Sequence, residues 1–241
     1  MSRGARIQLT PAYLLHHRPW RDSSRILEVL TREHGRLTLF ARGVRGPRAR
    51  LGAVLQPFQR LLLSFSGRGE AAQLTAAELA GHEPPLPPPA LLAAFYLNEL
   101  LLRLTTRHDA LPELFDHYQD TLAALRSGAP LEPCLRIFEK RLLELLGYGL
   151  ELATEARSGR PVRPEAHYDF RAGTGLTPAR APGGRALRGS SLLSLARERL
   201  AGRRELEDAR RLLQAALAAC LEGRPLATRA VAKSMKQRVV Q

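Results

Sequence analysis

A proline-rich run, EPPLPPP at residues 83–89, constrains the fold of this chain more than any other feature. Proline has no backbone donor and a fixed φ, so such a run enters neither a sheet ladder nor the interior of a helix. The hydrophobic pattern also differs on its two sides. Apolar and polar residues alternate in short stretches before the run, as in strands, and longer segments with the helical period follow it. The sequence therefore predicts an α+β protein whose two parts are joined by a stiff linker.

Residues 1–82 predict a small β-barrel. Strands are expected at residues 7–16, 26–31, 36–42 and 58–65, and residues 71–79 return as a fifth strand or a short helix. Turn residues occur at His34-Gly35 and in SGRGE, residues 66–70, and a polar loop is expected at residues 19–22. Five short strands with closely spaced turns are typical of a closed barrel. An OB-fold is the first interpretation, and an SH3-like barrel is the alternative.

Residues 90–152 and 191–241 predict a helical domain. Helices are expected at residues 90–106, 111–127, 131–146, 191–201 and 205–222. Pro133 near the start of the third helix and Gly147 after its end fit the usual positions of these residues at helix termini. Residues 153–190 lack the helical period and are rich in Gly, Pro and Arg. We expect them to form an irregular inserted module with one hairpin, at residues 166–171 and 175–179.

The positive charge of the chain is concentrated in two blocks. The net charge is +14, and residues 1–80 hold 13 basic against 5 acidic residues. Residues 156–241 hold 18 basic against 7 acidic residues, whereas the stretch between the two blocks holds 6 basic and 11 acidic residues. A genome rich in G and C would by itself favour arginine over lysine, so the placement of the charge is more informative than the residue type. Two basic blocks predict binding to a polyanion such as nucleic acid.

The candidate contacts to nucleic acid lie in the barrel. The loop at residues 42–50 holds four arginines and no acid, and the alternation in strand 36–42 places arginines and Phe40 on one face. Guanidinium groups meet phosphates and aromatic rings stack on unpaired bases, which suits single-stranded nucleic acid. A place in the barrel core is the alternative for Phe40 and Trp20. The predicted nucleic-acid contacts are Arg18, Arg21, Arg25, Arg36, Phe40, Arg42, Arg45, Arg48, Arg50 and Arg68, with Trp20 as a second candidate ring.

No sequence motif indicates an enzyme or a bound cofactor. The chain has no phosphate-cradling glycine loop, no nucleophile elbow and no zinc-binding HExxH helix. Glu113, Asp116, His117 and Asp120 could share one helix face and bind a metal, but an exposed acidic face explains the same residues, and no metal site is predicted. Its two cysteines, Cys134 and Cys220, fall in apolar helical patterns and are expected to be buried free thiols in a reducing cytosol. No apolar run has the length of a membrane span, so we expect a cytoplasmic protein. If its polyanion is DNA, we expect it to be nucleoid-associated.

Five sequence blocks in one order carry a family resemblance. They are LTREHGRLTLFARGVRG, LQPFQRLLLSFSGRGE, FYLNELLLRL, RIFEKRLLELLGYG and EGRPLATR. Together they extend over almost the whole chain, and their order resembles that of the RecO family of bacterial recombination mediators.

The resemblance implies an N-terminal OB-fold, a helical domain and a small inserted module. It also implies a non-enzymatic protein that binds single- and double-stranded DNA and anneals complementary strands. The implied protein partners are the C-terminal tail of the single-strand binding protein SSB, RecR, and RecA indirectly, because RecO and RecR load RecA at gaps. By matching positions, DNA would meet Arg36 and the basic loop, and the SSB tail would meet Leu135, Arg136, Lys140, Arg141 and Leu142.

The chain departs from the family pattern in two places. Many members carry a four-cysteine zinc module after the Gly-Tyr block, whereas the matching stretch here, ATEARSGRPVRPEAHYDF, has no cysteine. Near the end, Ala227-Thr228-Arg229 keeps only the arginine of a common Lys-Ser-Arg sequence. We therefore expect an inserted module without zinc ligands. An RNA-binding or ribosome-associated OB protein is the alternative function, because the same basic barrel would serve it.

Overall fold

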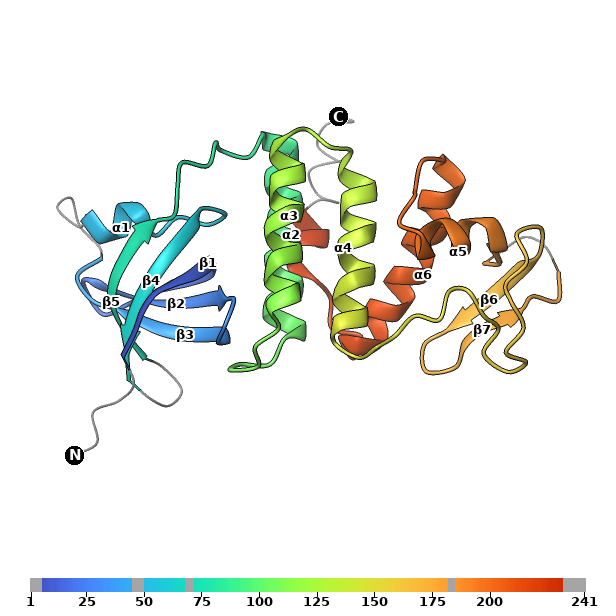
Figure 1. Ribbon diagram of the computed structural model, residues 1–241, viewed down its shortest axis with the longest axis horizontal. Helices are drawn as coiled ribbons and strands as arrows, with labels where there is room; N and C mark the ends of the chain where they lie inside the picture. The colour runs from blue at the N-terminus through green and yellow to red at the C-terminus, as the bar shows by residue number, and fades with distance from the viewer. Residues whose placement is uncertain (1–5, 45–49, 68–71, 182–184, 232–241) are drawn as a thin grey trace. The chain divides into compact units, whose positions relative to one another are not determined.

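The computed structural model describes residues 6–44, 50–67, 72–181 and 185–231, and for Arg50 the backbone only. The chain, drawn in Figure 1, divides into two compact units, Met1–Arg126 and Ser127–Gln241. Within the described ranges, no helix has the length and apolar character needed to cross a membrane. Those ranges also contain no group of three or more His, Cys, Asp or Glu residues arranged to hold a metal ion.

The first unit begins with a closed five-stranded barrel. Its strands are β1 (Arg6–Trp20), β2 (Ser24–Thr31), β3 (Gly35–Ala41), β4 (Arg60–Ser66) and β5 (Ala72–Leu79), in the order β1-β2-β3-β5-β4. The predicted OB-fold barrel is confirmed, and the fifth segment is a strand. A short helix, α1 (Arg50–Val54), was not predicted. The loop expected at residues 19–22 is also shorter than predicted, because Pro19 and Trp20 still pair with β2.

The barrel core follows from the alternation of the strands. Leu27 and Val29 of β2 and Leu37 and Leu39 of β3 point to one side and are at most 4% exposed. They pack with Leu63 of β4, so the apolar side of each strand faces the barrel interior. The opposite side of β1, β2 and β3 remains outside the barrel and is called the outer face below.

The turn between β2 and β3 requires glycine. Gly35 has a φ of 66°, in the left-handed region, and a Cβ placed there would lie 2.1 Å from the carbonyl oxygen of Asp109. The hydroxyl of Thr31 donates to the Gly35 carbonyl at 2.9 Å and closes the turn. The turn predicted at His34-Gly35 is therefore confirmed.

Two helices of the first unit pack against β1 of the barrel. They are α2 (Pro88–Leu104) and α3 (Pro112–Arg126). Tyr13 of β1 is fully buried, with its ring 5.1 Å from that of Tyr118 and 5.4 Å from that of Phe115. Asn98 donates to the Leu15 carbonyl at 2.9 Å and accepts a hydrogen bond from the Tyr118 hydroxyl. Aromatic packing and a satisfied buried amide therefore join these helices to the barrel.

The second unit consists of helices and a small sheet. The helices are α4 (Leu131–Leu145), α5 (Gly189–Ala196) and α6 (Arg203–Cys220). The sheet has the order β7-β6-β8 and contains β6 (His167–Arg171), β7 (Gly175–Pro178) and β8 (Leu187–Arg188). The hairpin predicted in the inserted module is confirmed, and the two-residue strand β8 was not predicted. Both cysteines are free, but each is only partly buried.

Candidate nucleic-acid interface

The outer face of the barrel brings arginine and aromatic side chains together. Arg18 pairs with Ile26 across β1 and β2, and Ile26 pairs with Phe40 across β2 and β3. Residues opposite one another in antiparallel strands point to the same side, so these three side chains form one row. Trp20 follows Arg18 by two residues on the same face, and Arg42 lies just after β3. We call Arg18, Trp20, Phe40 and Arg42 the aromatic-arginine face.

The two rings of this face contact each other and a guanidinium group. The Trp20 and Phe40 rings meet edge to face, with 5.8 Å between centroids, and the Arg18 guanidinium carbon lies 5.9 Å from the Trp20 ring centroid. Trp20 is 38% exposed and Phe40 is partly buried. Neither ring belongs to the barrel core, so the core alternative for these two residues is excluded.

The arginines near these rings are not neutralised within the described ranges. Arg18 and Arg42 are exposed and Arg25, at the rim of the barrel, is partly buried. None of the three forms an ion pair or side-chain hydrogen bond with another described residue. Asp22 is the acid of the adjoining turn. Burial lowers the pKa of His17, and the positive charge of Arg25 lowers it further.

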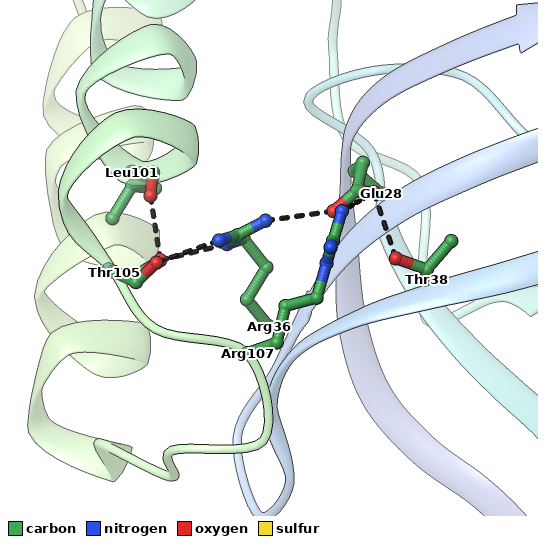
Figure 2. Close-up of polar contacts among 6 residues, drawn as sticks. All are labelled: Glu28, Arg36, Thr38, Leu101, Thr105 and Arg107. Atoms are coloured by element: carbon green, nitrogen blue, oxygen red, sulfur yellow. Dashed lines mark hydrogen bonds and ion pairs between the residues drawn. The ribbon is translucent and has the colours of Figure 1, made fainter. Parts of the chain in front are cut away.

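Arg36, a predicted DNA contact, is held inside the first unit. Figure 2 shows its guanidinium group between β2 and the end of α2. It donates to the Thr105 hydroxyl and carbonyl at 3.1 and 2.7 Å and to Glu28 at 2.9 Å. Its side chain is 12% exposed. These contacts give Arg36 a structural role in joining β3 to α2, and we leave it out of the proposed interface.

Glu28 is the acceptor at the centre of this network (Figure 2). Its two carboxylate oxygens accept from Arg107 at 2.6 Å, Thr38 at 2.9 Å and Arg36 at 2.9 Å. Desolvation raises the pKa of Glu28, but the hydrogen bonds from Arg107 and Thr38 and the two guanidinium charges outweigh it, so the pKa lies below its usual value. No local sequence pattern predicts this network, because Arg107 lies 79 positions from Glu28.

The remaining predicted DNA contacts are only partly described. Arg45, Arg48 and Arg68 lie outside the described residues, as does the side chain of Arg50. Arg21 is exposed in the turn after β1, with a φ of 50°. The basic loop therefore stays a prediction.

The residues predicted to bind the SSB tail lie on α4 of the second unit, and most of them are engaged. Arg136 is buried and pairs with Glu139 at 2.8 Å, and Leu142 is fully buried. Lys140 is also buried and pairs with Glu144 at 2.9 Å and with Glu198 at 3.1 Å. Arg141 and Leu135 are the more accessible members of the set.

Glu198 neutralises the two cations at the end of this set. Both of its carboxylate oxygens accept from Arg141, at 2.8 and 2.6 Å. The hydrogen bonds from Arg141 lower the pKa of Glu198. Desolvation of the carboxylate raises the pKa, but the hydrogen bond from Lys140 lowers it further, and the net shift is downward. Any acidic ligand at Arg141 would therefore compete with a carboxylate of the chain itself.

The strand order of the barrel and the helices that follow it define an OB-fold protein with a helical C-terminal region. Comparison with protein families gives two matches: the model described as "Recombination protein O N terminal" matches residues 6–82, and the model described as "Recombination protein O C terminal" matches residues 88–230. The chain belongs to the RecO family of DNA repair proteins.

Individual relatives agree with this assignment. The DNA repair protein RecO of Methylococcus capsulatus is 45% identical over 230 residues, which cover 95% of each chain. Its counterpart in Alkalilimnicola ehrlichii is 48% identical over 237 residues, covering 96% of this chain and 93% of the relative. The counterpart in Nitrosococcus oceani is 43% identical over 236 residues. The family resemblance seen in the sequence is thereby confirmed.

Proposed function

We propose that this protein is a non-enzymatic recombination mediator in DNA repair that binds single-stranded DNA on the aromatic-arginine face. The observation that carries the proposal is the contact between two partly accessible rings, Trp20 and Phe40, beside arginines that have no acidic partner among the described residues. Rings for bases and unpaired guanidinium groups for phosphates are the two parts that a single-strand surface needs.

The proposed mechanism is physical and breaks no bond. Arg18, Arg25 and Arg42 replace counterions along the DNA backbone, so binding becomes weaker as salt increases. A base stacks on Trp20 through its flat face and keeps its pairing edge free. A bound strand can then pair with a complementary strand. That complementary strand is either single-stranded or displaced from a duplex. We propose that the protein anneals strands in this way and binds double-stranded DNA through the same backbone contacts.

The protein partners proposed for this chain follow from the family. We propose that the acidic tail of SSB docks at Leu135 and Arg141 on α4, and that RecR acts with this protein to promote RecA loading. The support for the tail site is the guanidinium group of Arg141, which is 47% exposed and already binds one carboxylate in bidentate fashion.

The test of DNA binding compares two double variants with equal loss of charge. Arg18→Ser with Arg42→Ser removes the unpaired arginines of the face. Arg32→Ser with Arg103→Ser removes arginines of the same unit that pair with Asp116 and Glu99. For the first variant, we expect the slope of log affinity against log salt concentration to become shallower by about one for each phosphate contact removed. The second variant should bind as the wild type does. Equal losses in both variants would reject the assigned face.

The RNA-binding alternative is tested with the same proteins. RNA and DNA oligonucleotides of equal length and sequence compete for the wild-type protein. A surface that reads phosphates and base faces has little reason to prefer RNA, whereas an RNA-specific site contacts 2′-hydroxyl groups. A strong preference for RNA would replace the DNA repair proposal with the alternative one.

A further inference from the structure

The inserted module of the second unit, residues 153–190, holds an unusual set of arginines. Its sequence contains seven arginines and three acidic residues. All seven arginines are exposed. None of them forms an ion pair or a side-chain hydrogen bond within the described part of the chain. Such an uncompensated group of like charges repels itself unless an anion is bound.

The cations on the helices of the same unit differ from those of the module. On α4, Arg136 pairs with Glu139, and on α6, Arg203 pairs with Glu207 and Arg211 with Asp208. A codon bias toward arginine would affect helices and module alike. The unit therefore provides acidic partners for its helical cations and leaves the module without them.

Backbone pairing gathers the module arginines at the two ends of its sheet. At one end, Ala156 donates to the Leu176 carbonyl at 2.8 Å, and Gly175 pairs with Arg171, so the turn that carries Arg157 lies beside Arg171. At the other end, Arg188 pairs with His167.

Two further arginines join the second end. The Gly189 nitrogen donates to the Ala166 carbonyl and the Ser190 nitrogen to the Pro164 carbonyl, at 2.8 and 2.9 Å, which brings the segment after Arg163 beside Arg188. The Ala179 nitrogen donates to the His167 carbonyl at 2.9 Å, so Arg180 follows directly at this end.

One face of the sheet is exposed and basic, and the other is apolar. Arg171 and His167 lie on the same face of β6, because they are four residues, or about 13 Å, apart along the strand. Arg188 shares this face because it pairs with His167. Asp169 lies between them on that face. Tyr168 points to the opposite side and is 1% exposed, with its hydroxyl accepting from the Arg163 nitrogen at 2.9 Å. Apolar packing around Tyr168 thus holds this module, whose sequence has no cysteine, in shape.

We propose that this cysteine-free module is a second nucleic-acid surface, which binds the phosphate backbone of another strand or duplex while the barrel holds the first strand. The proposal rests on the DNA binding proposed above. The exposed sheet face presents guanidinium groups without an exposed aromatic ring, so binding is independent of base sequence. One chain with two separate phosphate-binding surfaces can bring two DNA molecules together.

The test separates the two surfaces. Single-stranded DNA is immobilised and saturated with the full-length protein, and capture of a labelled, non-complementary duplex is measured as salt increases. In the module variant, Arg157, Arg171 and Arg188 are each replaced by Ser. In the matched control, Ser replaces Arg203, Arg210 and Arg224, which pair with Glu207, Glu132 and Glu222.

We expect the module variant to bind the immobilised strand as the wild type does, and to lose the greater part of duplex capture. The slope of log capture affinity against log salt concentration should become shallower by about one for each phosphate contact removed. Lysine at the same three positions keeps the charge and should restore capture, which excludes a folding defect. The control should capture the duplex normally.

Three results would overturn the proposal. These are full capture by the module variant, an equal loss in the control, and a loss of binding to an acidic SSB-tail peptide with capture unchanged, which would make the module a peptide site. Failure of the wild type to bind the immobilised strand would instead reject the function proposed for the barrel, so the two failures are distinguishable.

Discussion

The carboxylate of Glu28 connects three segments of the first unit through Thr38, Arg36 and Arg107. Its lowered pKa means that the folded state favours the ionised form more than the unfolded chain does. The resulting stability is fully present above the pKa of an ordinary glutamate and is lost as the pH falls through the lower pKa of the folded state.

This network gives a prediction about acid stability. Glu28→Gln should lower the free energy of unfolding at neutral pH and should flatten its decline on acidification, because the residue no longer titrates. Urea unfolding at a series of pH values measures both effects. Glu33→Gln, at an exposed position of the neighbouring turn, is the control and should leave the curve unchanged. An identical pH dependence in the Glu28 variant and the wild type would contradict the role of the network.

Gly35 gives a second prediction at this scale. Gly35→Ala combines an unfavourable left-handed φ with a Cβ 2.1 Å from the Asp109 carbonyl oxygen, whereas Gly43→Ala has a φ of 64° and open space around the added atom. We expect the Gly43 variant to lose about 1–2 kcal/mol of stability and the Gly35 variant clearly more. Thermal unfolding compares them, and equal losses would show that the close approach to Asp109 is unimportant.

At the scale of elements, the alternation of residues 26–42 was enough to predict two strands, their turn and the inward face of the barrel. The helices were predictable from their period and from prolines and glycines at their ends. The sequence did not predict α1, β8 or the extension of β1 to Trp20. The extension depends on pairing with β2 across an irregularity between Leu14 and His16, and such pairing is not a local property of the sequence.

The predicted site shows the same limit. The choice of Arg18 followed from charge alone, and that of Arg42 from charge and the alternation of residues 36–42. The burial of Arg36, Arg136 and Lys140 did not follow. Burial depends on packing with distant parts of the fold, as Arg36 does with Thr105 and Lys140 with Glu198. A rule that counts basic residues cannot distinguish a guanidinium group that faces solvent from one that joins two elements.

The contact between α4 and Glu198 leads to a prediction for tail binding. Glu198→Gln removes the charge that competes for Lys140 and Arg141. The affinity for an acidic SSB-tail peptide should rise about two- to fivefold, as measured by fluorescence anisotropy. Glu132→Gln, which alters a carboxylate paired with Arg210, should leave the affinity unchanged. Weaker tail binding in the Glu198 variant would place the tail elsewhere.

At the scale of the whole molecule, the barrel packs against the two helices, α2 and α3, that follow its last strand. Tyr13 is buried against α3, and the Arg36 side chain ends on Thr105. A fragment of residues 1–126 should therefore unfold cooperatively, whereas residues 1–82 alone should unfold about 10 °C lower or fail to fold. Thermal unfolding followed by circular dichroism decides this, and equal midpoints would show that the barrel is independent of α2 and α3.

Each of the two basic blocks of the sequence contains one of the two proposed DNA-binding surfaces. The first block contributes rings together with arginines, and the inserted module contributes arginines alone. Single strands need both kinds of contact, whereas backbone binding to a second molecule needs charge only. The acidic stretch between the blocks supplies Asp116 as a partner for Arg32 of the barrel and Glu139 as a partner for Arg136 of α4.

The emission of Trp20, the only tryptophan of the chain, tests the central claim most directly. A titration with an unlabelled single-stranded oligonucleotide should quench this emission in proportion to the bound fraction, because a base stacks on the ring. The quenching should be lost as salt increases and in the Arg18→Ser, Arg42→Ser variant. Binding of a labelled oligonucleotide with no change in Trp20 emission would contradict the account.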